Sequence, residues 1–261
     1  MEIVIFKSKL YLISGSKDAS ICIWDLESKK LLWKLKEHKR KIFCIKRFKK
    51  NGNLYFASAG IDEEIIIWEL AGLEDLELPK PKFKLYGHTK SIYSLKVLKI
   101  GFDIYLASAG EDLNIIIWDL KLKKPYFYLK GHTKPILAMA TVTIPNSFQT
   151  LASAGGENIV FIWDLDTKQP MYKLSGHTNT IFTLKAFTIH DKPVLASGGG
   201  DNMILIWNLS NLKKDKEQKE IIRICRQTGF ILSFDVIIED DGKQSLVSGS
   251  YDKSILVSRF V

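Results

Sequence analysis

One short pattern recurs along the chain and restricts the folds that are open to it. The dipeptide Ile-Trp, followed by Asp, Glu or Asn, occurs five times at spacings of 44, 50, 45 and 44 residues. An acidic residue stands six positions before each tryptophan, and a serine stands four positions before that acid. A near-constant period of this length indicates that the chain is built from copies of one small unit. The tryptophans are Trp24, Trp68, Trp118, Trp163 and Trp207.

A histidine completes the pattern in four of the copies. It stands 30 or 31 residues before the tryptophan, as His38, His88, His132 or His177, and three of the four lie in the sequence Gly-His-Thr. A sixth, weaker copy keeps Ser248 and Asp252, but it has Ser258 at the tryptophan position and Gln227 at the histidine position. The chain therefore contains six repeats, and the last one is degenerate.

Each repeat has the pattern of several short strands. The residues that end at the tryptophans form continuous apolar runs, which are typical of strands buried on both faces: Ile65–Trp68, Ile115–Trp118, Ile159–Trp163 and Met203–Trp207. A glycine-containing turn lies between each serine and the following run, and we expect its glycine to supply the positive φ of a tight hairpin. Another apolar segment follows each histidine, such as Ile181–Phe187. Four strands in each repeat indicate a β-propeller.

The repeats resemble the WD-repeat (WD40) family, whose signature is a Gly-His pair followed by Trp-Asp. The resemblance covers the whole chain, is most specific in the second to fifth copies, and implies an all-β, six-bladed WD-repeat β-propeller. It also implies a single domain over residues 1–261, with repeats ending near residues 25, 69, 119, 164, 208 and 259.

The resemblance further implies a hydrogen-bonded tetrad in each complete blade. A buried acid needs hydrogen-bond donors, which an imidazole N–H and a turn amide can provide. Glu157 departs from the usual Asp, and its extra methylene is expected to alter the geometry of that blade. The implied tetrads are His38–Ser58–Asp62–Trp68, His88–Ser108–Asp112–Trp118, His132–Ser153–Glu157–Trp163 and His177–Ser197–Asp201–Trp207.

Serine, histidine and acid together also make up a hydrolase triad. The trio recurs in four successive repeats, whereas an active site is not normally copied into every blade, so the structural interpretation is preferred. Metal-ligand spacings such as HExxH and phosphate-binding glycine motifs are absent from the sequence. We therefore predict that the protein is not an enzyme, with no catalytic residue, metal site or cofactor.

Propellers of this family commonly bind partners on the face formed by the turn after Gly-His and the turn before the acid. The alternative interpretation is that these residues are ordinary solvated loop tips. Three apolar residues are unusual at such places, because exposed apolar groups can mark contacts. The candidate partner-binding residues are Lys39, Arg40, Lys41, Ile61, Lys90, Phe230 and Tyr251.

The net charge of +9 comes from one segment. Residues 29–50 contain eleven Lys or Arg and a single acid, Glu37, while the rest of the chain sums to −1. The predicted function is a non-catalytic protein-interaction scaffold or adaptor, as a subunit of a larger complex. The alternative is a nucleic-acid-associated propeller that uses the basic 29–50 segment, which is less favoured because its lysines would point in several directions.

The sequence also favours an intracellular location. Cys22, Cys44 and Cys225 are odd in number and scattered, so they suggest a reducing compartment, such as the cytoplasm, with the nucleus left open. No apolar run reaches the roughly 18 residues of a membrane span, and the first ten residues lack the pattern of a secretory signal. We expect no membrane partner.

The last repeat supplies three strands, at Ile231–Ile237, Ser245–Ser248 and Ile255–Phe260. Glu2–Phe6 is separated from Leu10–Ser14 by three residues, which span at most about 10 Å and suit a hairpin within the first blade. We therefore predict 23 strands, a last blade without its outer strand and no exchange of terminal strands. Ile255–Phe260 would then be a bare edge, so that either the chain is a piece of a longer one, or a partner or second copy adds a strand there.

Overall fold

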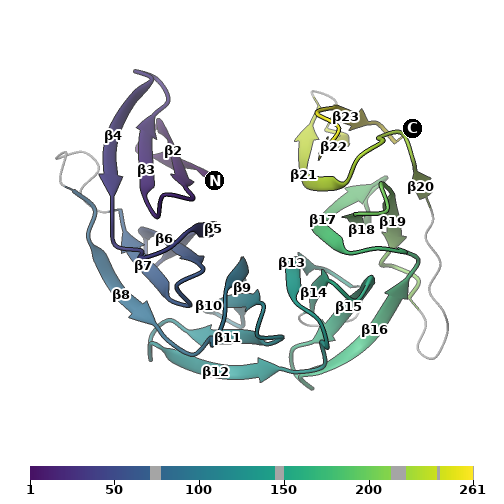
Figure 1. Cartoon of the computed structure of the whole chain (residues 1–261), viewed down its shortest axis with the longest axis horizontal. Helices are drawn as coiled ribbons and strands as arrows, with labels where there is room; N and C mark the ends of the chain where they lie inside the picture. The colour runs from purple at the N-terminus through teal and green to yellow at the C-terminus, as the bar shows by residue number, and fades with distance from the viewer. Residues whose placement is uncertain (71–77, 145–149, 213–221, 240–241, 261) are drawn as a thin grey trace. The chain divides into compact units, whose positions relative to one another are not determined.

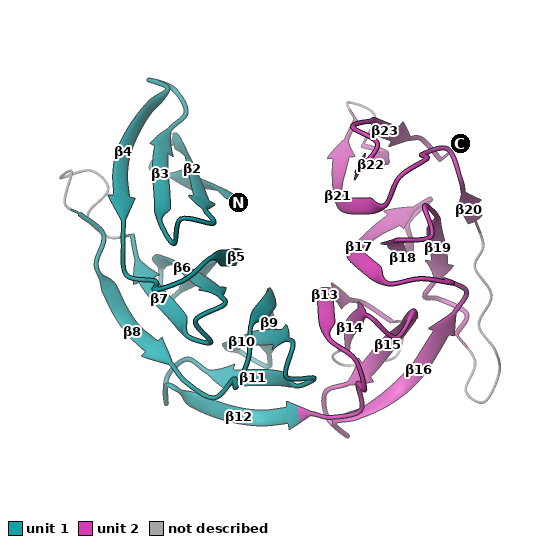
Figure 2. Ribbon diagram, viewed as in Figure 1, with its two compact units in different colours: residues 1–128 teal, residues 129–261 magenta. Residues whose placement is uncertain are grey.

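The structure, a computed structural model, describes residues 1–70, 78–144, 150–212, 222–239 and 242–260. These residues form 23 strands, paired antiparallel with their neighbours in six separate sheets. The chain divides into two compact units, residues 1–128 and 129–261, which are coloured separately in Figure 2. The prediction of a single domain over residues 1–261 stays a prediction.

Unit 1 contains three four-stranded sheets, blades 1 to 3, each formed by strands that follow one another in the chain (Figure 1). Blade 1 consists of β1 (Glu2–Phe6), β2 (Lys9–Gly15), β3 (Ile21–Asp25) and β4 (Lys30–Leu35). Blade 2 consists of β5 (Ile42–Lys50), β6 (Asn53–Gly60), β7 (Ile65–Glu69) and β8 (Pro81–Leu85). Blade 3 consists of β9 (Ile92–Ile100), β10 (Asp103–Gly110), β11 (Ile115–Asp119) and β12 (Lys124–Leu129).

Unit 2 contains blades 4 to 6. Blade 4 consists of β13 (Ile136–Val142), β14 (Thr150–Gly155), β15 (Ile159–Asp164) and β16 (Gln169–Ser175). Blade 5 consists of β17 (Ile181–Ile189), β18 (Lys192–Gly199), β19 (Ile204–Asn208) and β20 (Ile222–Ile224). Blade 6 has three strands among the described residues, β21 (Ile231–Ile238), β22 (Gln244–Ser250) and β23 (Ile255–Ser258).

The fold class is thus the predicted one, an all-β propeller of six blades whose last blade lacks an outer strand in the described part of the chain. β1 pairs with β2 from Glu2↔Ile13 to Phe6↔Lys9, so the first strand belongs to the first blade as predicted. Several strand limits differ from the expected ones, including those of β22, which spans Gln244–Ser250 rather than Ser245–Ser248. β19 begins at Ile204 rather than Met203, and β23 ends at Ser258, which leaves Phe260 outside the strand.

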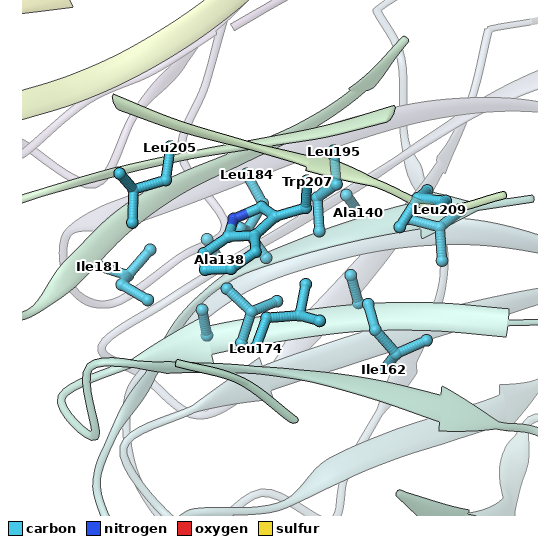
Figure 3. Packing of buried hydrophobic residues seen from close by; sticks show 14 of the residues in the cluster. Ala138, Ala140, Ile162, Leu174, Ile181, Leu184, Leu195, Leu205, Trp207 and Leu209 are labelled. Atoms are coloured by element: carbon cyan, nitrogen blue, oxygen red, sulfur yellow. The ribbon is translucent and has the colours of Figure 1, made fainter. Parts of the chain in front are cut away.

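Within each unit the core lies between successive blades, where Trp68, Trp118 and Trp207 are packed. Trp207 of β19 belongs to a cluster of buried residues that joins Leu174 of β16 and Ala138 of β13 to Leu184 and Leu195 of blade 5 (Figure 3). A blade that is covered on both faces requires continuous apolar runs rather than alternation. This arrangement explains why four consecutive residues are buried in β7, β11 and β19.

The turn glycines have a different role from the expected one. None of the glycines that follow the repeat serines has a positive φ; that conformation is taken by the non-glycine residue directly after each acid, as at Glu63, Leu113 and Lys253. A Cβ at Gly60, Gly110 or Gly155 would instead overlap the carbonyl oxygen of Lys41, Ser91 or Pro135. The glycine therefore allows the backbone of the turn to approach the loop that precedes the innermost strand, and the expectation of a positive φ was wrong.

This close approach makes the turn glycine sensitive to substitution. Gly110→Ala should lower the free energy of unfolding by about 3 kcal/mol, because the new methyl group overlaps backbone rather than a movable side chain. Gly101→Asn is the matched control, since Gly101 has φ +61 and open space around it, and asparagine tolerates that conformation. Chemical denaturation measures both changes, and equal stabilities for the two variants would contradict this account.

Candidate functional site

Blade 3 shows how the four polar residues that recur in the repeats come together. His88 lies in the loop before β9, Ser108 in β10, Asp112 in the next turn and Trp118 in β11. The Nδ1 atom of His88 is 2.8 Å from Asp112 Oδ2, and its Nε2 atom is 2.6 Å from Ser108 Oγ. Trp118 Nε1 donates to the same hydroxyl at 2.7 Å.

The directions of these hydrogen bonds follow from the groups involved. An ionised carboxylate only accepts and an indole N–H only donates. His88 Nδ1–H therefore donates to Asp112, and Nε2 accepts the hydroxyl proton of Ser108, whose oxygen accepts from Trp118. The side chains of all four residues are almost fully buried, and the hydrogen bonds among them satisfy the histidine, the serine and the tryptophan.

Blades 2 and 5 contain the same arrangement. In blade 2, His38 lies 2.7 Å from both Asp62 Oδ2 and Ser58 Oγ, and Trp68 donates to Ser58 at 2.9 Å. In blade 5, His177 lies 2.8 Å from Asp201 Oδ2 and from Ser197 Oγ, and Trp207 donates to Ser197 at 2.8 Å. In blades 2, 3 and 5 the residue after the histidine also donates its backbone N–H to the acid.

These donors favour the charged form of the acids. Burial by itself raises the pKa of Asp62, but the hydrogen bond from His38 and the backbone N–H of Lys39 outweigh it and hold the pKa below its usual value. The pKa of Asp112 is lowered in the same way, against the effect of burial, by His88 and Thr89. The carboxylates therefore stay ionised and tie the loop to the turn.

Blade 4 differs because Glu157 replaces the aspartate. Glu157 Oε1 accepts the backbone N–H groups of Thr133 and Lys134, but it lies 3.5 Å from His132 Nδ1, which has no hydrogen-bond partner among the described residues. The side chain of His132 is nonetheless almost fully buried. Burial lowers the pKa of His132 to about 4, although the charge of Glu157 acts in the opposite direction. The longer side chain of Glu157 thus accepts the hydrogen bonds of the loop amides, but it leaves His132 Nδ1 without a hydrogen bond.

The first and last blades stabilise the acid without a histidine. Asp18 accepts from the backbone and hydroxyl of Ser20 and from Lys34, and hydrogen bonding chiefly from Ser20 lowers its pKa. In blade 6, Ser248 Oγ donates to Gln227 Oε1 at 2.6 Å, so this glutamine occupies the histidine's place. The repeat register placed Gln227 at the histidine position, but it did not predict this hydrogen bond.

The arrangement is poorly suited to nucleophilic catalysis. Each of Ser58, Ser108, Ser153 and Ser197 is fully buried within a central strand. Its hydroxyl oxygen also accepts a hydrogen bond from tryptophan, so the group that would attack a substrate is already surrounded by protein. What the four residues can do is connect a loop, two strands and a turn.

The predicted partner-binding residues are mostly exposed. Lys39, Arg40, Lys41 and Lys90 are exposed in unit 1, whereas Ile61 is half-buried and donates its backbone N–H to the carbonyl of Lys41. In unit 2, Phe230 is 44% and Tyr251 72% exposed, and their rings lie 6.0 Å apart.

A third aromatic ring, missed by the sequence reasoning, extends this pair. Phe182 of β17 lies 5.9 Å from Phe230, so blades 5 and 6 together present a row of three rings. In unit 1, Phe43 and Tyr93 lie 5.3 Å apart. Phe43, Tyr93 and Phe182 each follow the buried isoleucine that opens the innermost strand of a blade. That repeated position is the signal by which the rings could have been found.

The basic segment is divided among several elements. Residues 29–50 run through β4, the following loop and β5. Three of their side chains are close to acids, since Lys34 is 3.0 Å from Asp18, while Lys46 and Arg47 lie 2.8 and 3.7 Å from Glu2. The segment therefore does not form one uniformly free basic surface.

The described residues were also considered as metal ligands and as membrane-spanning helices. Within the described ranges, no group of three or more His, Cys, Asp or Glu side chains is close enough to hold a metal ion. No helix of the described chain is long and apolar enough to cross a membrane.

The tetrads should contribute to stability. His177→Ala removes a buried side chain that bonds both Asp201 and Ser197, so we expect the free energy of unfolding to fall by roughly 1–3 kcal/mol. Thermal and chemical denaturation measure this loss. An unchanged melting temperature would be incompatible with a structural role for His177.

His132 should make stability depend on pH. Its pKa is about 4 in the folded protein and about 6.5 in the unfolded chain, so the unfolded chain binds the proton more readily. Its contribution is complete above pH 6.5 and is lost as the pH falls towards 4, by up to about 3 kcal/mol. Denaturation from pH 7 to 4 should show a smaller loss in Glu157→Asp, whose carboxylate can contact Nδ1 as in the other blades. A pH profile left unaltered by His132→Gln would contradict this assignment.

The repeats can now be compared with known proteins. The family profile described as WD domain, G-beta repeat, matches residues 4–25, 29–69, 79–119, 123–164 and 168–208, which are more than half of the chain. Comparison with curated proteins gives no significant match. The five matched repeats, which form blades and contain the tetrads, show that the chain belongs to the WD-repeat (WD40) family.

Proposed function

We propose that this protein is a non-catalytic interaction scaffold that acts as a subunit of a larger assembly. Propellers of the WD-repeat family generally bind protein partners. The tetrads, in this proposal, are structural, and binding takes place through the loops that they hold. The cytoplasm is the proposed location, with the nucleus left open, and the three free cysteines, of which Cys225 is exposed, suit a reducing compartment.

The observation that carries this proposal is the aromatic row Phe182–Phe230–Tyr251. Phe230 and Tyr251 are exposed and Phe182 is half-buried, and neighbouring exposed rings of this kind can mark a contact surface, because aromatic residues are enriched at protein interfaces. The row is also fixed in place, because Tyr251 donates its backbone N–H to the carbonyl of Phe230 at 2.9 Å. A preorganised row of this kind loses little conformational entropy when a partner binds.

Exposed charges on the loops of unit 1 are suited to a polar rim. Lys39, Arg40, Lys41 and Lys90 are exposed on the corresponding loops of unit 1 and belong to the same proposed partner-binding face, together with Ile61. Rim charges steer association and specificity more than they add affinity. The nucleic-acid alternative is not favoured by the basic segment, because part of its charge is paired with Asp18 and Glu2.

A second mode of partner binding is proposed at the edge of β23. Among the described residues, β23 pairs with β22 and with no other strand. An unpaired strand edge is a template for an added strand. The segment Ile255–Phe260 is therefore the proposed place of strand addition.

The aromatic row can be tested by substitution. The double variant Phe230→Ser, Tyr251→Ser should fold with a melting temperature close to that of the wild type, since both side chains are largely exposed. It should lose the protein partner that copurifies with the wild type from native cells. Phe102→Ser is the matched control, because Phe102 is fully exposed in the β9–β10 hairpin and is not part of the aromatic row.

The outcomes separate the two functional classes. Retention of the partner by the double variant would refute the proposed face. Binding of nucleic acid that disappears between low and physiological salt, unaffected by the aromatic substitutions, would favour the nucleic-acid alternative.

A further inference from the structure

A cavity of about 770 Å³ lies within unit 2, between the outer strand of blade 5 and the last strand of blade 6. Its apolar lining comes from Ile222 and Ile224 of β20 and from Val257 and Phe260 at the end of the chain. Ser258 also lines it, at the position where the other five repeats have tryptophan. The comparable place between blades 4 and 5 is filled by Trp207 against Leu174.

The other face of β23 is also uncovered. In blades 1, 2, 4 and 5 the residue corresponding to Ile255 pairs with an aliphatic residue of the outer strand and is at most 1% exposed. Ile255 itself is 76% exposed, and Val257 is 46% exposed. Among the described residues, β23 has no outer strand beside it that could cover these side chains.

The outer strands of the other blades show which side chains such a strand presents. In blade 2, Phe83 and Leu85 of β8 pair with Ile67 and Ile65, and Lys84 stands between them. Blade 1 repeats this order with Trp33, Lys34 and Leu35, and blade 4 with Tyr172, Lys173 and Leu174. An occupant of blade 6 should likewise place apolar residues opposite Val257 and Ile255.

The residue between the two apolar positions should have the opposite charge in blade 6. Lys84 lies 2.8 Å from Glu64, and this hydrogen bond, aided by the charge of Glu37, holds the pKa of Lys84 above its usual value despite burial. At the corresponding positions of the last repeat stand Ser254 and Arg226. Where Lys84 of blade 2 has two acids nearby, the last blade therefore has a hydroxyl and a guanidinium.

Other charges around the cavity have the same sign. Its described lining includes Arg226 and Arg259 and no carboxylate, although Arg259 also contacts Glu239 at 2.9 Å. Arg223 lines the cavity as well, but it already has an interaction partner. The nearest tetrad acid, Asp252, is already engaged by donors from Thr228 and Ser254. Asp18, which binds Lys34 in blade 1, has no such loop donor in the described structure and so remains available to a cation.

We propose that β23 and the adjoining cavity bind an extended segment of a partner protein in which apolar and acidic residues alternate. The segment pairs antiparallel with β23, places apolar side chains opposite Ile255 and Val257, and directs acidic side chains towards Arg226 and Arg259. This inference rests on the proposed protein-binding function and gives the chemistry of the partner at the strand edge.

The chain's own outer strand provides a matched pair of probes. One peptide has the β8 sequence, Pro-Lys-Phe-Lys-Leu, and the other has glutamate in place of both lysines, each with blocked termini. In calorimetric titration the glutamate peptide should bind the full protein at least about tenfold more tightly than the lysine peptide. A glutamate peptide with N-methyl groups on alternate amides should lose binding, because it cannot pair along one edge.

Protein variants locate the binding. Arg226→Glu should weaken the glutamate peptide at least about tenfold and strengthen the lysine peptide, whereas Lys130→Glu, an exposed charge outside the cavity, should change neither. Ile255→Ser should weaken both peptides without lowering the melting temperature, because the side chain is already exposed. No saturable binding of the glutamate peptide, or equal binding of both peptides, would overturn the proposal.

Two further measurements complete the test. If the wild type sediments as a dimer and Ile255→Ser as a monomer, the occupant is a second copy of this chain and the proposal is wrong. The Phe230→Ser, Tyr251→Ser variant should bind the glutamate peptide as the wild type does. Failure of the strand edge and failure of the aromatic face are therefore distinguishable.

Discussion

The structure depends on a buried chain of hydrogen bonds that crosses each complete blade. In blade 3 it runs from Trp118 through Ser108 and His88 to Asp112, and so joins two strands, a loop and a turn. A buried polar group without a hydrogen-bond partner lowers the free energy of unfolding by about 1–3 kcal/mol. This series of hydrogen bonds therefore stabilises a blade only when all four residues are present. The loops it fixes are those that carry the exposed residues of the proposed partner-binding face. Stability and recognition are thus connected through the same four side chains.

Where the pattern is incomplete, other groups satisfy the same atoms. Gln227 accepts the hydroxyl proton that a histidine accepts elsewhere, and Glu157 reaches the loop amides while leaving His132 without its usual bond. The first case preserves the geometry with a neutral side chain, and the second introduces a histidine that is neutral and under-bonded at pH 7. A degenerate repeat is therefore a blade whose polar requirements are met differently, and it need not be a disordered one.

The sequence predicted the parts that follow from periodicity. The number of repeats, the apolar runs at strands such as β7 and β11, the pairing of β1 with β2 and the three-stranded last blade were all confirmed. The role of Gly110 was wrong, because a close approach to Ser91 across strands leaves no trace in local sequence. The same reason explains why Phe182 and the cavity beside Ser258 were missed. Both arise from residues of neighbouring blades, and a repeat pattern describes each blade separately.

The last blade shows how a repeat protein can acquire a specific surface by losing part of its pattern. Replacement of tryptophan by Ser258 leaves space where a ring would pack, and Arg226, at the position of Glu37 in blade 2 and of glycine in blades 3 to 5, gives the last blade a positive charge there. Either change alone would lower the stability of the blade without determining which kind of outer strand it can bind. Together they disfavour the lysine-bearing strand type that this chain uses in blades 1, 2 and 4, and so discriminate against pairing with its own kind of outer strand. The edge of β23 disfavours lysine-bearing outer strands and retains the apolar residues Ile255 and Val257. It is therefore suited to bind a strand from a different protein.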